Sequence, residues 1–121
     1  MKKINRLKKN HEIASIVQKK KRVIRSDFTV YYEKNIEGIN KFAISVSKKY
    51  GNAVERNYIK RVVREIVRPR LKEIVGVSAV IVIRNSCQQH SFIELKMELQ
   101  EILKIINQRI QGENNEIKAK L

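Results

Sequence analysis

The segment Ser45–Glu65 restricts the possible fold most strongly, because it passes from the end of a strand through a tight turn into a two-faced helix. Gly51 and Asn52 mark the turn, and the helix is predicted from about Asn52 to Val67, with Pro69 ending or kinking it. At about 100° per residue, six polar or cationic side chains share roughly 140° of the circumference. They are Arg56, Asn57, Lys60, Arg61, Arg64 and Arg68. The opposite flank can be buried, and it consists of Tyr58, Ile59, Val62, Val63 and Ile66.

Positive charge is concentrated in two blocks of the chain. The 121 residues include 27 Lys plus Arg against 12 Asp plus Glu, a formal net charge of +15. Ten cations lie in residues 1–25 with one acid, and nine lie in residues 48–72 with two acids. From residue 85 onward the signs balance, five against five. Such blocks are typical of proteins that bind a phosphate backbone, and a merely solvated basic surface is the alternative.

Hydrophobic periodicity predicts the remaining elements. A short helix is expected from Asn10 to about Lys20, and a capping box at Ser91–Glu94 opens the last helix. That helix carries an apolar stripe at Phe92, Leu95, Leu99, Ile102, Leu103, Ile106 and Ile110. The expected strands are a brief edge strand at Val23–Ile24, alternating strands at Phe28–Glu33 and Phe42–Val46 joined by a hairpin loop over Asn35–Asn40, and a central strand buried on both faces at Val77–Ile83.

The order α-β-β-β-α-β-α predicts one α+β domain over residues 1–121. Its architecture is expected to be a two-layer α/β sandwich with a mainly antiparallel four-stranded sheet. Residues 1–9 are basic and aperiodic, which predicts a mobile arm, and residues 112–121 are polar, which predicts a disordered tail.

One face of the two alternating strands is unusually small and amphipathic. It carries Thr29, Tyr31, Ala43, Ser45 and Ser47, where an ordinary exposed sheet face more often carries Lys and Glu. A shallow groove beside the basic helix is the functional interpretation, and an exposed sheet face is the structural one. Single-stranded nucleic acid suits such a groove, because Tyr31 can stack on a base while Lys48 or Arg84 contacts phosphates.

Catalysis by this polypeptide alone is not expected. Asp27 is the only aspartate, and His11 and His90 lie in unrelated segments without the spacing of metal ligands. Two-metal phosphodiester cleavage requires clustered carboxylates, and no such cluster can be picked out. Glu55 and Glu65 lie among arginines and are expected to form helix-surface pairs.

The sequence also bears on compartment. No run of 18 apolar residues occurs, and the Lys-rich beginning is not followed by an apolar stretch, so neither a membrane span nor a signal peptide is expected. Cys87 is the only cysteine, which excludes an internal disulfide and fits a reducing compartment. We therefore expect a cytoplasmic protein in which Cys87 is an unreactive small side chain.

The stretch Phe42–Glu65 closely resembles the protein subunit of bacterial ribonuclease P. The shared signature is a Gly-Asn-Ala-Val turn beginning at Gly51, followed by Arg56-Asn57, Lys60-Arg61 and Arg64 at the same spacing. The resemblance also takes in Asn5-Arg6-Leu7, the strand Phe28–Tyr31 and the strand ending in Arg84, and it covers about residues 3 to 110. It implies the α+β fold inferred above, with a left-handed crossover around the signature helix.

The resemblance implies an accessory role in an endoribonuclease. In that family the RNA subunit performs the Mg²⁺-dependent hydrolysis that removes the 5′ leader of precursor tRNA, and the protein binds both RNAs. The implied partners are the catalytic RNA and precursor tRNA, with no membrane, no further protein and no cofactor or metal held by the protein. The residues implied to face the catalytic RNA are Asn52, Arg56, Asn57, Lys60, Arg61, Arg64 and Arg68. Those implied to face the leader are Ile13, Val17, Thr29, Tyr31, Ser47, Lys48, Lys49 and Arg84.

The chain departs from the family pattern in its first helix, where Ile13 and Val17 occupy positions that are often aromatic. Base stacking contributes roughly 1–3 kcal/mol per base, so the resemblance implies leader binding that depends more on charge.

Two other functional classes remain. A general RNA-binding module with the same fold would not prefer precursor over mature tRNA once the catalytic RNA is present, and a self-sufficient nuclease would cleave precursor tRNA without any RNA subunit. A helix-turn-helix DNA reader fits poorly, because strands flank the basic helix on both sides.

Overall fold

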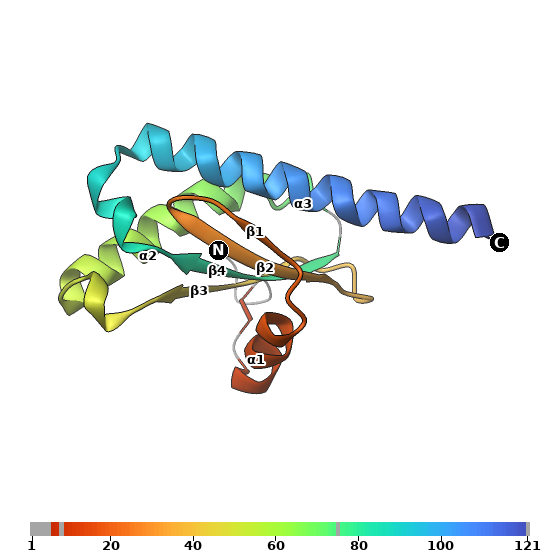
Figure 1. The fold of residues 1–121 in the computed structure, drawn as a ribbon, viewed down its shortest axis with the longest axis horizontal. Coiled ribbons are helices and arrows are strands. Elements are labelled where there is room, and N and C mark those ends of the chain that lie inside the picture. The colour runs from red at the N-terminus through yellow and green to blue at the C-terminus, as the bar shows by residue number, and fades with distance from the viewer. Residues whose placement is uncertain (1–5, 8, 75, 121) are drawn as a thin grey trace.

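A computed structural model describes residues 6–7, 9–74 and 76–120, with side chains as far as Glu113. Its elements follow the predicted order (Figure 1). The helices are α1 (Asn10–Gln18), α2 (Ala53–Val67) and α3 (Phe92–Lys120), with short 3₁₀ turns η2 (Lys48–Tyr50), η3 (Arg68–Arg70) and η4 (Asn85–Gln89). The strands are β1 (Arg22–Ile24), β2 (Phe28–Lys34), β3 (Lys41–Val46) and β4 (Val77–Ile83).

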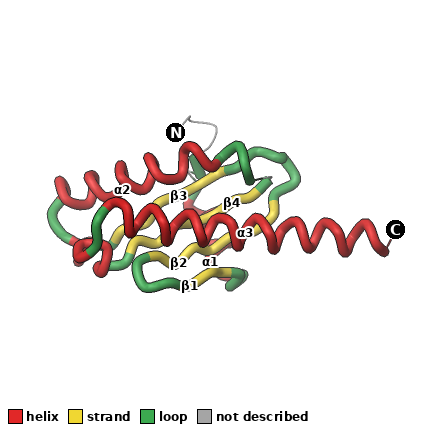
Figure 2. Tube along the Cα trace, turned by 90° about the horizontal axis from the view of Figure 1, so that it is seen from above, coloured by secondary structure: helices red, strands yellow, loops and turns green. Residues whose placement is uncertain are grey.

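The four strands form one sheet in the order β1-β2-β4-β3. β4 pairs antiparallel with β2 and parallel with β3, and β1 pairs antiparallel with β2. α2 and α3 cover one face of the sheet, and α1 lies against the opposite face (Figures 1 and 2). The α+β fold, the mainly antiparallel sheet and the central position of β4 are confirmed.

The predicted hairpin between β2 and β3 is wrong, because β4 lies between these two strands. The loop from Asn35 to Asn40 instead crosses the start of β4. Asn35 holds this loop closed, since its backbone N–H donates to Gly76 O at 2.8 Å and its side-chain amide donates to Ile39 O at 2.7 Å. β2 and β3 therefore each pair with β4 and do not pair with each other.

β3, α2 and β4 form a β-α-β crossover, because β3 and β4 are parallel neighbours joined through α2. The side chain of Asn40 links the start of this crossover to its end. The buried side-chain amide of Asn40 donates to Leu71 O at 2.7 Å and to Ile74 O at 2.6 Å, and its oxygen accepts from Val77 N at 3.0 Å. The left-handed sense of the crossover stays a prediction.

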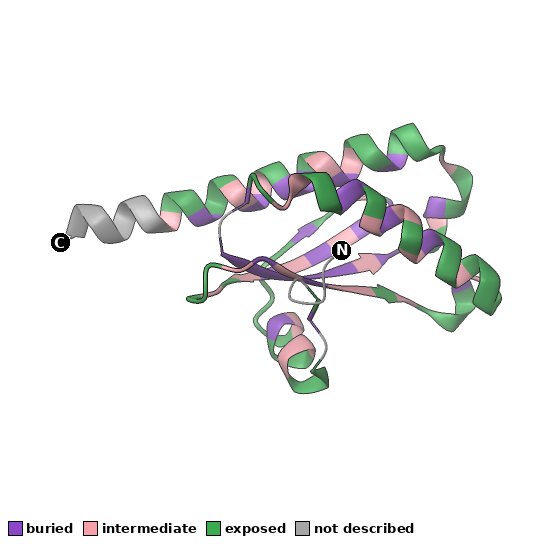
Figure 3. Cartoon of the chain, turned by 180° about the vertical axis from the view of Figure 1, so that it is seen from behind, coloured by how far each residue is buried: buried purple, intermediate pink, exposed green. Residues whose placement is uncertain are grey.

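The core is split unequally by the sheet (Figure 3). The larger part lies under α2 and α3, where alternate residues of β2 and β4 meet the buried stripe of α3. The smaller part lies under α1, where Ile16 and Leu7 pack against Val80 of β4. Both faces of β4 are thus buried, as its apolar run predicts.

The structure describes part of each chain end. Arg6 forms a parallel bridge with Phe42, and Leu7 N donates to Phe42 O at 2.9 Å, so these two residues of the expected arm lie along β3; residues 1–5 and 8 are outside the described part. α3 continues through Gly112 to Lys120, where a disordered tail was predicted. An interior glycine costs a helix about 1 kcal/mol, which the good helix formers around it can offset.

We expect Asn40→Ala to lower the free energy of unfolding by about 2–3 kcal/mol, because it leaves buried carbonyls and a buried N–H without partners. Urea denaturation followed by circular dichroism measures this change. Asn85→Ala, at an exposed position of η4, is the control and should change stability by less than about 0.5 kcal/mol. Equal midpoints for Asn40→Ala and the wild type would contradict the assigned role.

Candidate nucleic-acid interface

α2 begins with a capping box. Glu55 N donates to Asn52 Oδ1 at 2.9 Å, and Asn52 N donates to Glu55 Oε1 at 3.1 Å. Gly51 leaves room for this arrangement, because a Cβ there would lie 2.9 Å from the Glu55 carboxyl group. Asn52 therefore has a structural role at the position that the resemblance assigns to RNA contact. Glu55 caps the helix and does not form the arginine pair expected from its neighbours in sequence.

The cationic flank of α2, defined as Arg56, Asn57, Lys60, Arg61, Arg64 and Arg68, faces away from the core. Two of its members have partners: Arg56 donates to Gly51 O at 3.0 Å, and Arg68 pairs with Glu65 at 2.6 Å. Among the described residues, Lys60, Arg61 and Arg64 form no ion pair. Positive charge on this flank is therefore left free for an external anion.

The opposite flank of α2 is only partly as predicted. Ile59, Val63 and Ile66 are buried, but Tyr58 is 63% exposed. Tyr58 lies at the boundary of the expected apolar arc, where α3 covers it only partly. The prediction that Tyr58 can be buried is wrong.

The second sheet face is built from rows of paired residues. Thr29 pairs with Val82, which pairs with Ser45, and Tyr31 pairs with Val80, which pairs with Ala43. The Tyr31 row is partly covered by α1, whereas the Thr29 row ends at the exposed Ser45. The predicted groove is therefore a narrower strip than the five residues suggested, open along Thr29, Ser45 and Ser47.

α1 forms one wall of this strip. Ile13 and Val17 are half-buried and pack beside Tyr31 and Ala43, so they reach the face to which the resemblance assigns them. The guanidinium of Arg22 lies 6.0 Å from the centre of the Tyr31 ring, which places a cation at the edge of the strip.

The strip ends at a cluster of cations. Because β3 and β4 are parallel and Val46 pairs with Ile83, Ser47 and Arg84 leave the sheet side by side at the same edge. Lys48 and Lys49 follow in η2, both exposed. The structure thus brings together residues from two distant segments that the sequence could only place separately.

A hollow of about 260 Å³ joins the strip to the cationic flank of α2. It is lined by side chains of α1, β3 and α2, among them Ile13, Ala43 and Arg64, together with Arg6 from the segment before α1. Arg6 is a candidate site residue that sequence reasoning missed. Its only sequence signal was its place in the Asn5-Arg6-Leu7 resemblance, since the bridge to Phe42 is a long-range contact.

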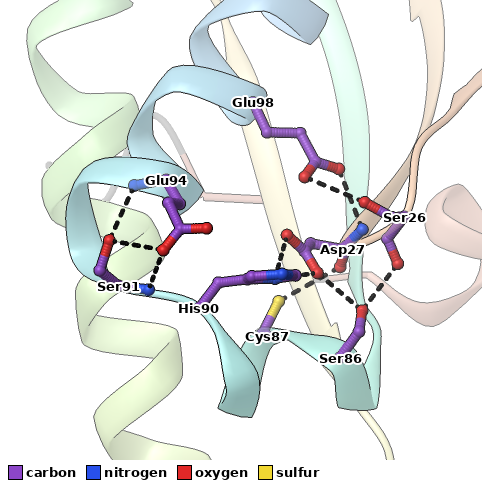
Figure 4. Close-up of polar contacts among 8 residues, drawn as sticks. All are labelled: Ser26, Asp27, Ser86, Cys87, His90, Ser91, Glu94 and Glu98. Atoms are coloured by element: carbon purple, nitrogen blue, oxygen red, sulfur yellow. Dashed lines mark hydrogen bonds and ion pairs between the residues drawn. The ribbon is translucent and has the colours of Figure 1, made fainter.

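A separate polar network surrounds Asp27 (Figure 4). Its carboxylate accepts hydrogen bonds from Ser86 Oγ at 2.7 Å and from His90 Nδ1 at 2.9 Å. Burial acts to raise the pKa of Asp27, but hydrogen bonding led by Ser86 outweighs it and leaves the pKa lowered. The network joins the end of β4 to the start of α3, and this gives it a structural role.

Within the described residues, no three His, Cys, Asp or Glu side chains are grouped closely enough to hold a metal ion. Among the described helices, none has both the length and the apolar composition that crossing a bilayer requires.

Comparison with known proteins gives one consistent family. A family model described as Ribonuclease P matches residues 1–107. The ribonuclease P protein component of Bacillus cereus strain AH187 is 41% identical over 106 residues, covering 86% of this chain and 92% of the relative. That of Mesoplasma florum is 39% identical over 99 residues, covering 80% and 90%.

Solved structures agree. The RNase P protein of Staphylococcus aureus superposes with a TM-score of 0.79 at 34% identity, covering 86% of this chain and 96% of that protein. The RNase P protein of Thermotoga maritima gives a TM-score of 0.74 at 29% identity, covering 82% and 94%.

We expect Cys87 to react with a thiol reagent at pH 8 at least about 100-fold more slowly in the folded protein than in guanidinium chloride. Burial, aided by the nearby Asp27 carboxylate, raises the pKa of the Cys87 thiol to about 12, so almost no thiolate is present. Absorbance of the released thiolate measures the rate, and the absence of other cysteines makes the signal unambiguous. Equal rates in both states would contradict the buried position.

Proposed function

This chain belongs to the ribonuclease P protein family, and we propose that it binds the catalytic RNA through the cationic flank of α2 and the 5′ leader of precursor tRNA through the strip beside α1. In this proposal the RNA subunit supplies the Mg²⁺-dependent hydrolysis that yields the mature tRNA 5′ end. The protein contributes no catalytic group and acts by holding two RNAs together.

One observation carries the proposal: Lys60, Arg61 and Arg64, which form no ion pair among the described residues, lie on a helix that adjoins the strip. Two RNA molecules that meet at one active centre repel each other strongly. Cations placed between them lower this repulsion and release condensed counterions, which favours binding entropically. The protein is then expected to reduce the Mg²⁺ concentration that the reaction requires.

The strip beside α1 has the character of a single-strand site. Its surface is apolar or neutral at Ile13, Val17 and Thr29, and cations stand at its end in Lys48, Lys49 and Arg84. A single strand can lay its bases along such a surface while its phosphates meet the terminal cations. With no aromatic residue at Ile13 or Val17, charge at the strip's end takes a larger share of the affinity.

We expect Lys60→Ala and Arg64→Ala to reduce precursor-tRNA cleavage by the reconstituted holoenzyme mainly at low Mg²⁺, with partial recovery at high Mg²⁺. Each substitution removes a cation that offsets RNA–RNA repulsion, and added Mg²⁺ replaces part of that charge. Cleavage rates across a Mg²⁺ titration measure the effect. Lys72→Ala, which removes an exposed cation outside the interface, should leave the titration unchanged. Normal cleavage by both variants at low Mg²⁺ would refute the proposal.

We expect the double variant Lys48→Ala, Arg84→Ala to bind precursor tRNA more weakly while its binding of mature tRNA is unchanged. For a single strand, each lost phosphate contact reduces the slope of log K against log salt by about 0.7, so the slope should fall by about 1.4. Filter binding of holoenzyme to both tRNAs at several salt concentrations measures this. A loss shared equally by precursor and mature tRNA would argue against a leader contact.

A further inference from the structure

Most aromatic side chains of the protein are buried or partly covered, but two of them are exposed. The chain has four tyrosines, three phenylalanines and no tryptophan. Tyr58 and Phe92 are 63% and 48% exposed, whereas Tyr31 lies half-covered by α1. The buried ones are Phe28, Phe42, Tyr32 and Tyr50. The two exposed rings come from different helices, α2 and α3, and line the same hollow.

This hollow, which we call the aromatic notch, lies between the middle of α2, η4 and the start of α3. Its volume is about 160 Å³, with Val62 and Leu95 contributing apolar lining beside the two rings. A second hollow of about 420 Å³ adjoins it and shares Tyr58 and Gln88. The notch therefore opens outward past Tyr58 and is not sealed by the fold.

Two polar side chains in the notch are held firmly and keep one hydrogen-bonding atom each. His90 Nδ1 faces the buried Asp27 carboxylate at 2.9 Å, so it carries a hydrogen and Nε2 is the free ring atom (Figure 4). The side-chain amide nitrogen of Gln88 donates to Tyr50 O, which leaves Oε1 available. Within the described residues, neither Nε2 of His90 nor Oε1 of Gln88 has a partner. The notch thus combines aromatic faces with fixed polar edge groups.

The notch is continuous with the cationic flank of α2. Arg61 lies three residues after Tyr58, so the two side chains are neighbours on the helix surface. A strand whose phosphates follow the flank would carry its bases past Tyr58. The notch itself is not strongly basic, since Glu55 lines the adjoining hollow and is engaged in the cap of α2. It is therefore better suited to a neutral base than to a phosphate.

From these observations we infer that the aromatic notch receives an unstacked nucleobase of the catalytic RNA, held against Tyr58 and Phe92. The inference rests on the proposed function, because it assumes that this RNA lies along the cationic flank of α2. Stacking on two aromatic rings requires no particular base, and the Oε1 of Gln88 accepts a hydrogen bond from an exocyclic amino group. Adenine, cytosine and guanine carry that group and uracil does not.

The test uses Tyr58, because its exposure means that truncation removes little packing. Tyr58→Ala should weaken binding of the cognate catalytic RNA about tenfold, the typical cost of losing one stacked base. The loss should be the same at low and high salt, because stacking releases no counterions. Met97→Ala, at an exposed apolar position of α3 outside the notch, is the matched control and should bind normally.

Tyr58→Trp provides a direct reading of contact, since the chain has no other tryptophan. It should retain the wild-type affinity within about twofold, because indole also stacks on bases. Its fluorescence should be quenched when the catalytic RNA is added, and Phe92→Leu in the same background should reduce that quenching.

The outcomes separate the two proposals. Normal binding by Tyr58→Ala together with an unquenched tryptophan overturns the notch and leaves the proposed function standing. Failure of the wild-type protein to bind the catalytic RNA overturns both. If Tyr58→Ala keeps full RNA affinity but changes the sedimentation of the free protein, the notch is a contact between copies of the chain and the inference is wrong.

Discussion

The burial of β4 on both faces is the constraint from which the rest of the architecture follows. A strand with this apolar run needs a neighbour at each edge and cover above and below. β2 and β3 take the edges, and α2 and α3 cover one face (Figure 2). α1 is only nine residues long and covers part of the other face. The strip that we assign to the leader is the uncovered remainder, so it exists because the smaller core is incomplete.

The same constraint places the strip next to the cationic flank. β3 must lie parallel to β4 for the chain to return through α2, so both strands end at one edge of the sheet. α2 begins only a few residues beyond that edge, after η2 and the capped turn at Gly51. Residues from three separate segments therefore share one surface without any contact between their side chains being required. Asn40 holds this return path together from the opposite end of the crossover.

Residues close together in the sequence were sufficient to predict much of the fold. The two-faced pattern of α2, the capping box at Ser91 and the apolar run of β4 each depend on residues close in sequence, and each was correctly predicted. The order of strands in the sheet could not be predicted in this way, because the alternation of apolar and polar residues in β2 and β3 is the same whether they pair with each other or with β4. Arg6 was missed for a similar reason, since its position depends on Phe42. Tyr58 was misplaced because helical periodicity gives a direction but not how far the neighbouring helix reaches.

In the proposed function, the charge arrangement also links RNA binding to the stability of the protein. Lys60, Arg61 and Arg64 lie within four residues, about one helical turn or 6 Å along the axis, which is inside a Debye length of about 8 Å, so their like charges repel one another. Glu55 could have offset it, but its carboxylate is turned to the backbone of Asn52 at the positive end of the helix. An RNA that binds only the folded state removes the repulsion and adds its own binding free energy to stability. In this proposal, the like charges that repel in the isolated protein are the ones that the bound RNA neutralises.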